Sequence, residues 1–229
     1  MPITLTFQCH TVDCIESTQI SLQSLVIAGW TGRDAAAVAH HIDELAALGV
    51  PKPKTTPVFY SAATSRITQA STVEMLGQAS SGEAEVALIQ SGGALWVGLG
   101  SDHTDREAEV HGISLSKQMC DKPISSILWR YTDVAPHWDS LVLRSTIIEA
   151  GEKVLYQDGP VSTLLAPSDL IARYTSEQTL ADGTVLFCGT HPAIGGVRAS
   201  KRFEMALIDP VLNRSIVHGY DVMALPIEG

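Results

Sequence analysis

Residues 83–102 read EAEVALIQSGGALWVGLGSD. Two apolar runs, Ala84 to Ile89 and Ala94 to Gly100, flank a segment with the composition of a turn, Gln90-Ser91-Gly92-Gly93. Short apolar runs bounded by glycine are typical of strands, and a glycine pair between them favours a tight antiparallel connection. This stretch therefore predicts a β-hairpin.

Three acidic side chains stand at the open end of this hairpin. Glu83 and Glu85 are two residues apart, so their side chains leave the same face of a strand. Opposite positions of an antiparallel hairpin sum to a constant, which puts a residue near 100 to 102 across from Glu83, and Asp102 falls there. Three carboxylates that meet form a hard oxygen site that suits Mg²⁺, with Mn²⁺ or Ca²⁺ possible. In a second interpretation, the two glutamates decorate a solvated strand and Asp102 caps a following helix.

The whole chain has the pattern of an α+β protein that is mostly β. A helix is predicted over Ala35 to Leu48, and further strands are predicted at 3–8, 20–29, 140–148, 154–157, 184–188, 203–208 and 215–222. Many strands with few short helices favour a sheet-rich, barrel-like core. The 229 residues suit an N-terminal region over 1–80 with strands and a lid-like helix, and a core over 81–229, or one continuous domain.

Composition excludes several classes of protein. A hydrophobic share of 45% with 17% charged residues is typical of a compact globular chain rather than a disordered one. The 25 acidic against 15 basic side chains repel nucleic acid. No apolar run is long enough for a membrane helix, and the first residues lack a basic and apolar leader, so we expect a cytoplasmic protein without a membrane partner. The four cysteines have no paired spacing and are expected to be reduced.

From Glu83 to Val222 the order of segments resembles the fumarylacetoacetate hydrolase superfamily. The strand at 83–89 is similar to the Glu-x-Glu strand of that family, and residues 100–107 are similar to its Asn-Asp-Val-Thr-Ala-Arg-Asp segment. In this match Asp102 takes the place of the metal aspartate, and Arg106 takes that of a substrate-binding arginine. Lys117 falls in the place of the family lysine, where a cation can hold a substrate carboxylate or a developing enolate. The resemblance implies a sheet-rich roll with Glu83, Glu85 and Asp102 as metal ligands.

A later segment, residues 180–196, resembles the family strand that leads to Thr-Gly-Thr-Pro-x-Gly-Val-Gly. In that motif a threonine and glycine amides line the substrate pocket, so the resemblance implies substrate contacts from Thr190 and Gly189. His103 and His191 are expected to lie nearer the predicted metal than His41 does, and they are further candidates for contact with a substrate. The connection between Glu85 and Asp102 is shorter than the helix-containing connection usual in the superfamily, which indicates an uncharacterised branch.

The resemblance places the catalytic base near the N-terminus, where the family has a His-x-x-Glu pair on a short helix. His41-Ile42-Asp43-Glu44 keeps this spacing, and three residues are nearly one helical turn. Glu44 could orient His41 to take a proton from water. Arg33 and Asp34 are rival candidates for the chemistry of this segment, because the Asn-Tyr pair that precedes the family histidine does not occur here.

The resemblance implies a divalent-metal-dependent hydrolase that cleaves a carbon–carbon bond in a small oxo acid of the acylpyruvate type. Decarboxylation and tautomerisation of an oxo acid are the alternatives within the superfamily, and a relative that binds a small ligand without turnover is a further one. A serine hydrolase is disfavoured because no Gly-x-Ser-x-Gly run occurs. We expect Mg²⁺ as the cofactor and a homodimer as the assembly, while the identity of the substrate is left open.

Overall fold

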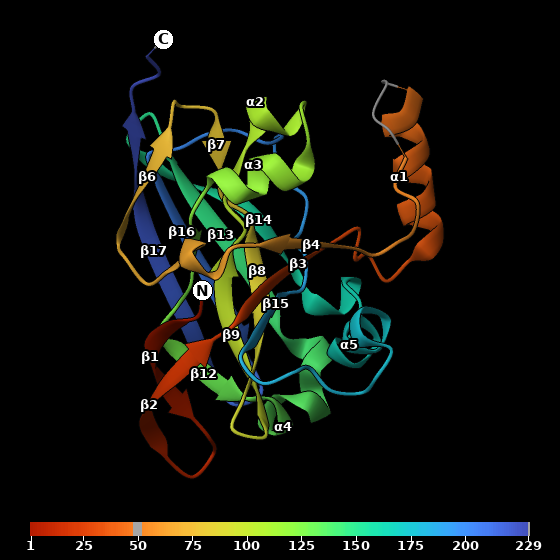
Figure 1. Ribbon diagram of the computed structural model, residues 1–229, viewed down its shortest axis with the longest axis vertical. Coiled ribbons are helices and arrows are strands. Elements are labelled where there is room, and N and C mark those ends of the chain that lie inside the picture. Colours follow the sequence, from red (N-terminus) through yellow and green to blue (C-terminus); the bar gives the residue numbers. More distant parts are fainter. Residues whose placement is uncertain (48–51, 229) are drawn as a thin grey trace.

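The computed structural model describes residues 1–47 and 52–228, and within them two β-sheets carry the fold (Figure 1). The larger sheet has eight strands in the order β2-β1-β12-β9-β8-β15-β3-β4. In chain order these are β1 Ile3–His10, β2 Ile15–Leu22, β3 Ser24–Gly29, β4 Val58–Ala62, β8 Ala84–Ser91, β9 Ala94–Ser101, β12 Ile127–Arg130 and β15 Thr184–Phe187.

The second sheet has five strands in the order β14-β13-β16-β17-β6. They are β6 Thr72–Leu76, β13 Val142–Glu149, β14 Glu152–Pro160, β16 Arg202–Asp209 and β17 Arg214–Leu225. Two short pairs complete the strands, β7 Ser80–Ser81 with β10 Thr104–Asp105, and β5 Ile67–Thr68 with β11 Lys122–Pro123. Strands from residues 1–80 therefore belong to both main sheets.

Helices are few and short, as the sequence predicts. They are α1 Ala35–Ala47, α2 Arg106–Glu109, α3 Ile113–Met119, α4 Tyr131–Val134 and α5 Pro167–Thr175, with 3₁₀ turns at 64–66, 135–140 and 161–163. α1 stands to one side of the sheets in Figure 1, and none of its described side chains is buried. Among the described residues, no helix has the length and apolar character needed to cross a membrane.

The predicted hairpin is confirmed as β8 and β9. The strands pair in antiparallel register from Ala84 with Ser101 to Ser91 with Ala94. Gly92 and Gly93 form the two-residue turn, with φ values of +59° and +75°. Positive φ at both central residues is the geometry of a type I′ turn, whose twist matches that of the strands, and glycine adopts it without steric cost.

The eight-stranded sheet curls into a partly closed barrel. β2 is an edge strand and β3 is the seventh strand across the sheet, yet only Gln23 separates them in sequence. One residue can bridge them only if the sheet curves until its ends approach each other. The predicted single strand over 20–29 is therefore wrong, because the chain leaves one end of the sheet and joins the other at Gln23, whose amide donates to the carbonyl of Gly183 over 2.8 Å.

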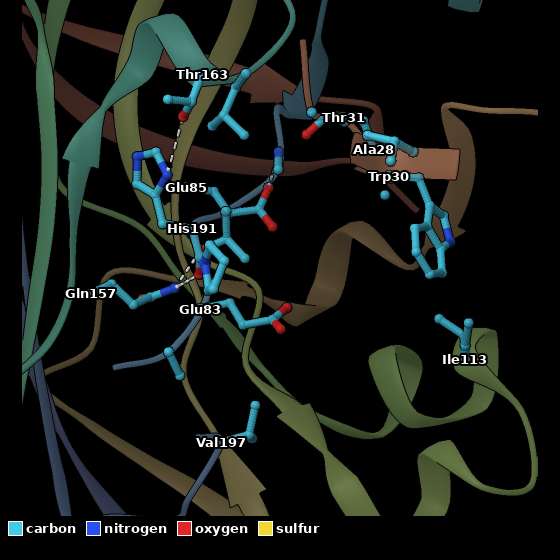
Figure 2. A pocket seen from close by; sticks show the side chains of 18 of the residues that line it. Ala28, Trp30, Thr31, Glu83, Glu85, Ile113, Gln157, Thr163, His191 and Val197 are labelled. Atoms are coloured by element: carbon cyan, nitrogen blue, oxygen red, sulfur yellow. Dashed lines mark hydrogen bonds between the residues drawn. The ribbon is translucent and has the colours of Figure 1, made fainter. Parts of the chain in front are cut away.

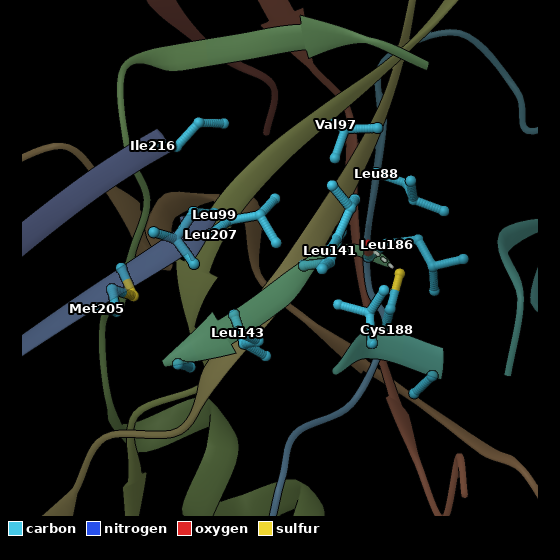
Figure 3. Packing of buried hydrophobic residues seen from close by; sticks show 14 of the residues in the cluster. Leu88, Val97, Leu99, Leu141, Leu143, Leu186, Cys188, Met205, Leu207 and Ile216 are labelled. Atoms are coloured by element: carbon cyan, nitrogen blue, oxygen red, sulfur yellow. Dashed lines mark hydrogen bonds between the residues drawn. The ribbon is translucent and has the colours of Figure 1, made fainter. Parts of the chain in front are cut away.

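Both faces of β8 are buried, and this explains its continuous apolar run. Ala87 and Ile89 pack with Phe187 in a cluster on one face of the curled sheet. Val86 and Leu88 pack on the other face, where a larger cluster fills the space between the two sheets (Figure 3). Glu85 is two residues before Ala87, so it lies on the same face as that residue, at the end of the strand.

Candidate metal centre

Three carboxylates converge at the open end of the β8–β9 hairpin. Glu83 precedes β8, Glu85 lies on it and Asp102 follows β9, and one carboxylate oxygen of each lies within 4.8 Å of the others. The amide of Asp102 donates to the carbonyl of Glu83 over 2.9 Å, which continues the ladder of the hairpin. Glu85 is 2% exposed and Asp102 is 0% exposed. The solvated-strand interpretation is therefore wrong, and the cap of α2 is Asp105, whose carboxylate accepts from the amide of Ala108 over 2.8 Å.

Two predicted cations contact this acidic triad. The ammonium of Lys117 pairs with Asp102 and lies 3.9 Å from Glu83 Oε2. The guanidinium of Arg106 lies 3.0 Å from Glu83 Oε1 and 3.2 Å from Glu109 Oε2. Burial alone would lower the pKa of Lys117, but Asp102 and Glu83 outweigh it and hold that pKa above its usual value. Lys117 is therefore a buried ammonium beside the triad.

The carboxylates of the triad differ in their pKa shifts and in their hydrogen-bond partners. Burial, together with the charges of Asp102 and Glu83, raises the pKa of Glu85 well above its usual range. Burial would also raise the pKa of Asp102, but Lys117 and Lys122 outweigh it and lower that pKa. Asp102 Oδ1 is buried and has no hydrogen-bond partner among the described residues. A buried oxygen with open lone pairs beside two further carboxylates suits a hard cation, so the triad can hold Mg²⁺, Mn²⁺ or Ca²⁺.

Sequence reasoning missed Lys122, which lies behind the triad. Its side chain is 0% exposed and its Nζ is 3.5 Å from Asp102 Oδ1. The ammonium donates to the carbonyls of His103 over 2.6 Å and Cys120 over 3.1 Å, and also to that of Lys117. Lysine is almost never fully buried without partners, and here its ammonium joins the backbone at His103 to the end of α3 beside Asp102. No periodicity or motif marks it in the sequence.

The segment after β15 closes one side of the triad. The amide of Gly189 donates to Glu85 Oε2 over 2.7 Å, and the hydroxyl of Thr190 donates to the carbonyl of Ala84 over 2.6 Å. A Cβ at Gly189 would lie 1.9 Å from Thr31 Oγ1, and φ is +93° there, so only glycine fits. Both residues line the cavity described below, where they could contact a substrate, and the Gly189 amide is already used by Glu85.

Gln157 on β14 is a second residue that sequence reasoning missed. Its Nε2 donates to Thr190 Oγ1 over 2.7 Å and to the carbonyl of His191 over 2.6 Å. Its Oε1 accepts from the amide of Ala84 over 3.0 Å and from Ser145 Oγ over 2.8 Å. This buried amide uses each of its oxygen and nitrogen atoms twice and joins the second sheet to the start of β8.

A cavity of about 800 Å³ opens in front of the triad (Figure 2). Glu83, Glu85, Arg106 and Lys117 contribute its charged side, together with Glu109 and Asp34. Figure 2 shows the carboxylates of Glu83 and Glu85 directed into this space. A concave site of this size with convergent charged groups has the properties of a small-molecule site.

The two candidate histidines take different places. His103 is 1% exposed and its Nδ1 lies 2.9 Å from Tyr220 Oη, so it points into the protein and does not line the cavity. His103 is therefore not placed to contact a substrate in the cavity, as was expected, and its ring lies against Tyr220 instead. His191 lines the cavity, and its Nδ1 lies 3.4 Å from Thr163 Oγ1. Burial lowers the pKa of His191 and so favours the neutral ring.

His41 and Glu44 fall within α1, as predicted, but their side chains lie outside those that the structure describes. The rival pair has structural contacts. Arg33 makes two hydrogen bonds to Asp139, of 2.9 and 2.7 Å, and Nε of Arg33 donates to the carbonyl of Leu164. Asp34 Oδ1 accepts from two amides in the first turn of α1 and caps that helix. Arg33 and Asp34 therefore anchor the start of α1.

Solved structures share this architecture. Cg1458 with inhibitor has a TM-score of 0.64 and 16% identity, over 93% of this chain and 82% of that one. A 2-keto-3-deoxy-D-arabinonate dehydratase, complexed with magnesium and 2,5-dioxopentanoate, has a TM-score of 0.62 and 14% identity, over 88% and 74%. The 4-oxalocrotonate decarboxylase from Pseudomonas putida G7, complexed with calcium and acetate, has a TM-score of 0.55 and 14% identity, over 86% and 76%. The chain thus has the fold of the fumarylacetoacetate hydrolase superfamily.

Within this superfamily fold, the chain belongs to the family described as a protein of unknown function (DUF2848), whose model matches residues 28–220. No curated protein sequence gives a significant match. The predicted superfamily fold is confirmed, and the match to a family of unknown function agrees with the predicted uncharacterised branch.

Proposed function

We propose that this chain is a divalent-metal-dependent enzyme that acts on a small oxo acid. The observation that carries the proposal is the buried meeting of Glu83, Glu85 and Asp102 at the edge of a cavity. Lys117 and Arg106 lie against this triad. Proteins of the same fold include a dehydratase with bound magnesium and a decarboxylase with bound calcium, which supports the assignment of a reaction on an oxo acid.

In this proposal the three carboxylates hold the ion and the neighbouring cations act on the substrate. A divalent cation, when bound, supplies Lewis-acid stabilisation of negative charge on oxygen. Lys117 can donate to a substrate oxygen that gains negative charge, and its own partner Asp102 keeps it protonated. Arg106 fixes Glu83 through an ion pair. Thr190 attaches its segment of the cavity lining to β8 through the hydrogen bond to the carbonyl of Ala84.

The contacts favour a reaction whose main demand is the stabilisation of an enolate, as in decarboxylation, where loss of CO₂ leaves the enolate; tautomerisation also needs a group that moves a proton to or from carbon. Among the described groups, Lys117 and the triad meet that demand. Hydrolysis of a carbon–carbon bond is the second candidate, and it also requires a base that activates water. The observation in its favour is that Ala37 and Val38 of α1 line the cavity, so the helix that carries His41 and Glu44 borders the site.

Metal binding is the first test, read by thermal unfolding and calorimetry with Mg²⁺, Mn²⁺ and Ca²⁺. We expect each ion that binds to raise the Tm of the native chain, because a ligand of the folded state stabilises it. Glu85→Gln and Asp102→Asn should lose this shift. Glu74→Gln, an exposed glutamate on β6, is the matched control and should keep it. An unchanged shift in both site variants would end the metal assignment.

Turnover is the second test, with a panel of acylpyruvates and oxaloacetate-like acids, with and without Mg²⁺. Release of CO₂ identifies decarboxylation, whereas a carboxylic acid fragment formed with uptake of water identifies hydrolysis. Only hydrolysis should depend strongly on His41, so His41→Asn should abolish it and leave the Mg²⁺ shift in Tm intact. Tight binding of panel members without any product would identify a ligand-binding protein and overturn the enzyme proposal.

A further inference from the structure

The cavity is far larger than a small oxo acid requires. Its volume is about 800 Å³, and one water molecule takes up about 30 Å³ of liquid volume. An acid the size of pyruvate displaces only a handful of such molecules. Cavities of this size bury ligands of drug-like dimensions, so most of the space would remain open around an acid held at the triad.

The wall away from the triad is apolar. Trp30 and Ile113 lie across the cavity from Glu83 and Glu85 in Figure 2. Val38 from α1 and Val197 from the segment after β15 also line the cavity, and Val197 lies on the side of Glu83 in Figure 2. Val197 is 55% exposed, so its side chain is available to a ligand rather than used in the core.

The charges of the lining exclude a second carboxylate on the ligand. Within the described part of the chain, the lysine and arginine side chains of the lining are Lys117 and Arg106, and both are paired with acidic groups. The acidic residues of the lining are Asp34, Glu83, Glu85 and Glu109, which outnumber these cations. A carboxylate at the far end of a ligand would meet apolar groups, without an unpaired lysine or arginine among the described lining residues, and burying it there is costly.

We propose that the substrate is a monocarboxylic oxo acid with an uncharged apolar extension, alkyl or aryl, that lies against Val38, Ile113 and Val197. The inference rests on the proposed function, because the acid head is assigned to the triad. The inference adds the chemical class of the extension, which is called the tail below. Dicarboxylic oxo acids of similar length are the class that this wall rejects.

Stable analogues can measure the tail separately from the head. Oxalate carries the chelating head alone, and N-alkyl oxamates add methyl, propyl or pentyl groups to a similar head. With the Mg²⁺-loaded protein, calorimetry should give a Kd that falls about threefold to fourfold for each added methylene, the increment expected for burial in an apolar site. The oxamate that ends in a carboxylate, with the length of the pentyl compound, should bind at least tenfold more weakly than the pentyl compound.

Substitution then locates the tail. Val197→Asp should reduce the ratio of Kd values between methyl and pentyl oxamate to less than threefold, and this exposed position tolerates the change. Val217→Asp, an exposed valine on β17, is the matched control and should keep the full ratio. If oxalate binds but the Kd does not depend on chain length, or the carboxylate-terminated compound binds best, the tail inference fails while the proposed function stands. If oxalate does not bind in the presence of Mg²⁺, the proposed function itself fails.

Discussion

Replacing Lys122 by methionine tests how the fold supports its acidic triad. The side chain is 0% exposed, and its ammonium donates to three carbonyls and lies 3.5 Å from Asp102 Oδ1. Methionine has a similar length but leaves those carbonyls without a donor and Asp102 with one cation fewer. Removal of one partner of a buried ion pair costs about 3–5 kcal/mol, because the other charge remains buried. One kcal/mol shifts Tm by about 2–4 °C in a domain of this size, so we expect a fall of roughly 6–20 °C.

The assay is thermal unfolding in EDTA, so that no bound ion masks the loss. Lys201→Met, an exposed lysine before β16, is the matched control, and its Tm should stay within about 2 °C of the native value, since exposed substitutions seldom exceed 0.5 kcal/mol. A Lys122→Met protein that unfolds within 3 °C of the control would refute the view that this lysine compensates Asp102, and with it the charge balance described for the site.

Three further changes probe the surroundings of the triad. Burial lowers the pKa of His103 to about 3, so the folded ring stays neutral while the unfolded ring binds a proton below about pH 6.5. The free energy of unfolding should therefore decrease as the pH is lowered, by up to about 1.4 kcal/mol per pH unit between roughly 6.5 and 3. Urea titrations in EDTA should show that the free energy of unfolding of His103→Asn depends less steeply on pH than that of the native chain. Gln157→Leu removes four hydrogen bonds, two of them to backbone groups. It should cost about 2–5 kcal/mol in urea unfolding, and a loss below 1 kcal/mol would contradict the role of this amide. Gly189→Ala places a methyl group 1.9 Å from Thr31 Oγ1, so its Tm should fall further than that of Gly151→Ala, where φ is +89° and the space is open. Equal losses would show that backbone strain alone matters.

The hairpin and the meeting of its carboxylates could be predicted because short-range rules fix them. The period of two puts Glu83 and Glu85 on one side, and the Gly92-Gly93 turn sets the register that brings Asp102 to them. The curl of the sheet could not be predicted from such short-range rules. Ile20 to Gly29 is apolar enough to read as one strand, and only the tertiary structure shows that the chain changes its place in the sheet at Gln23.

The support of the site could not be predicted, because its partners are distant in sequence. Gln157 meets Ala84, which precedes it by 73 positions, and His103 meets Tyr220, which follows it by 117. His103 also shows why closeness in sequence misleads. It is adjacent to Asp102, but alternation along the chain turns its ring away from the cavity and into the protein.

The balance of charge around the triad decides which substitution gives the cleaner test of metal binding. Asp102→Asn leaves Lys117 and Lys122 buried beside a neutral amide, so it should weaken the fold as well as the metal site. Glu85→Gln has the opposite effect on the fold, because burial and two neighbouring carboxylates already oppose the ionised form of Glu85. An amide oxygen can still accept from the amide of Gly189. In the absence of metal, Glu85→Gln should therefore unfold at the native Tm or above it, and a lost response to Mg²⁺ in that variant would report on the ion alone.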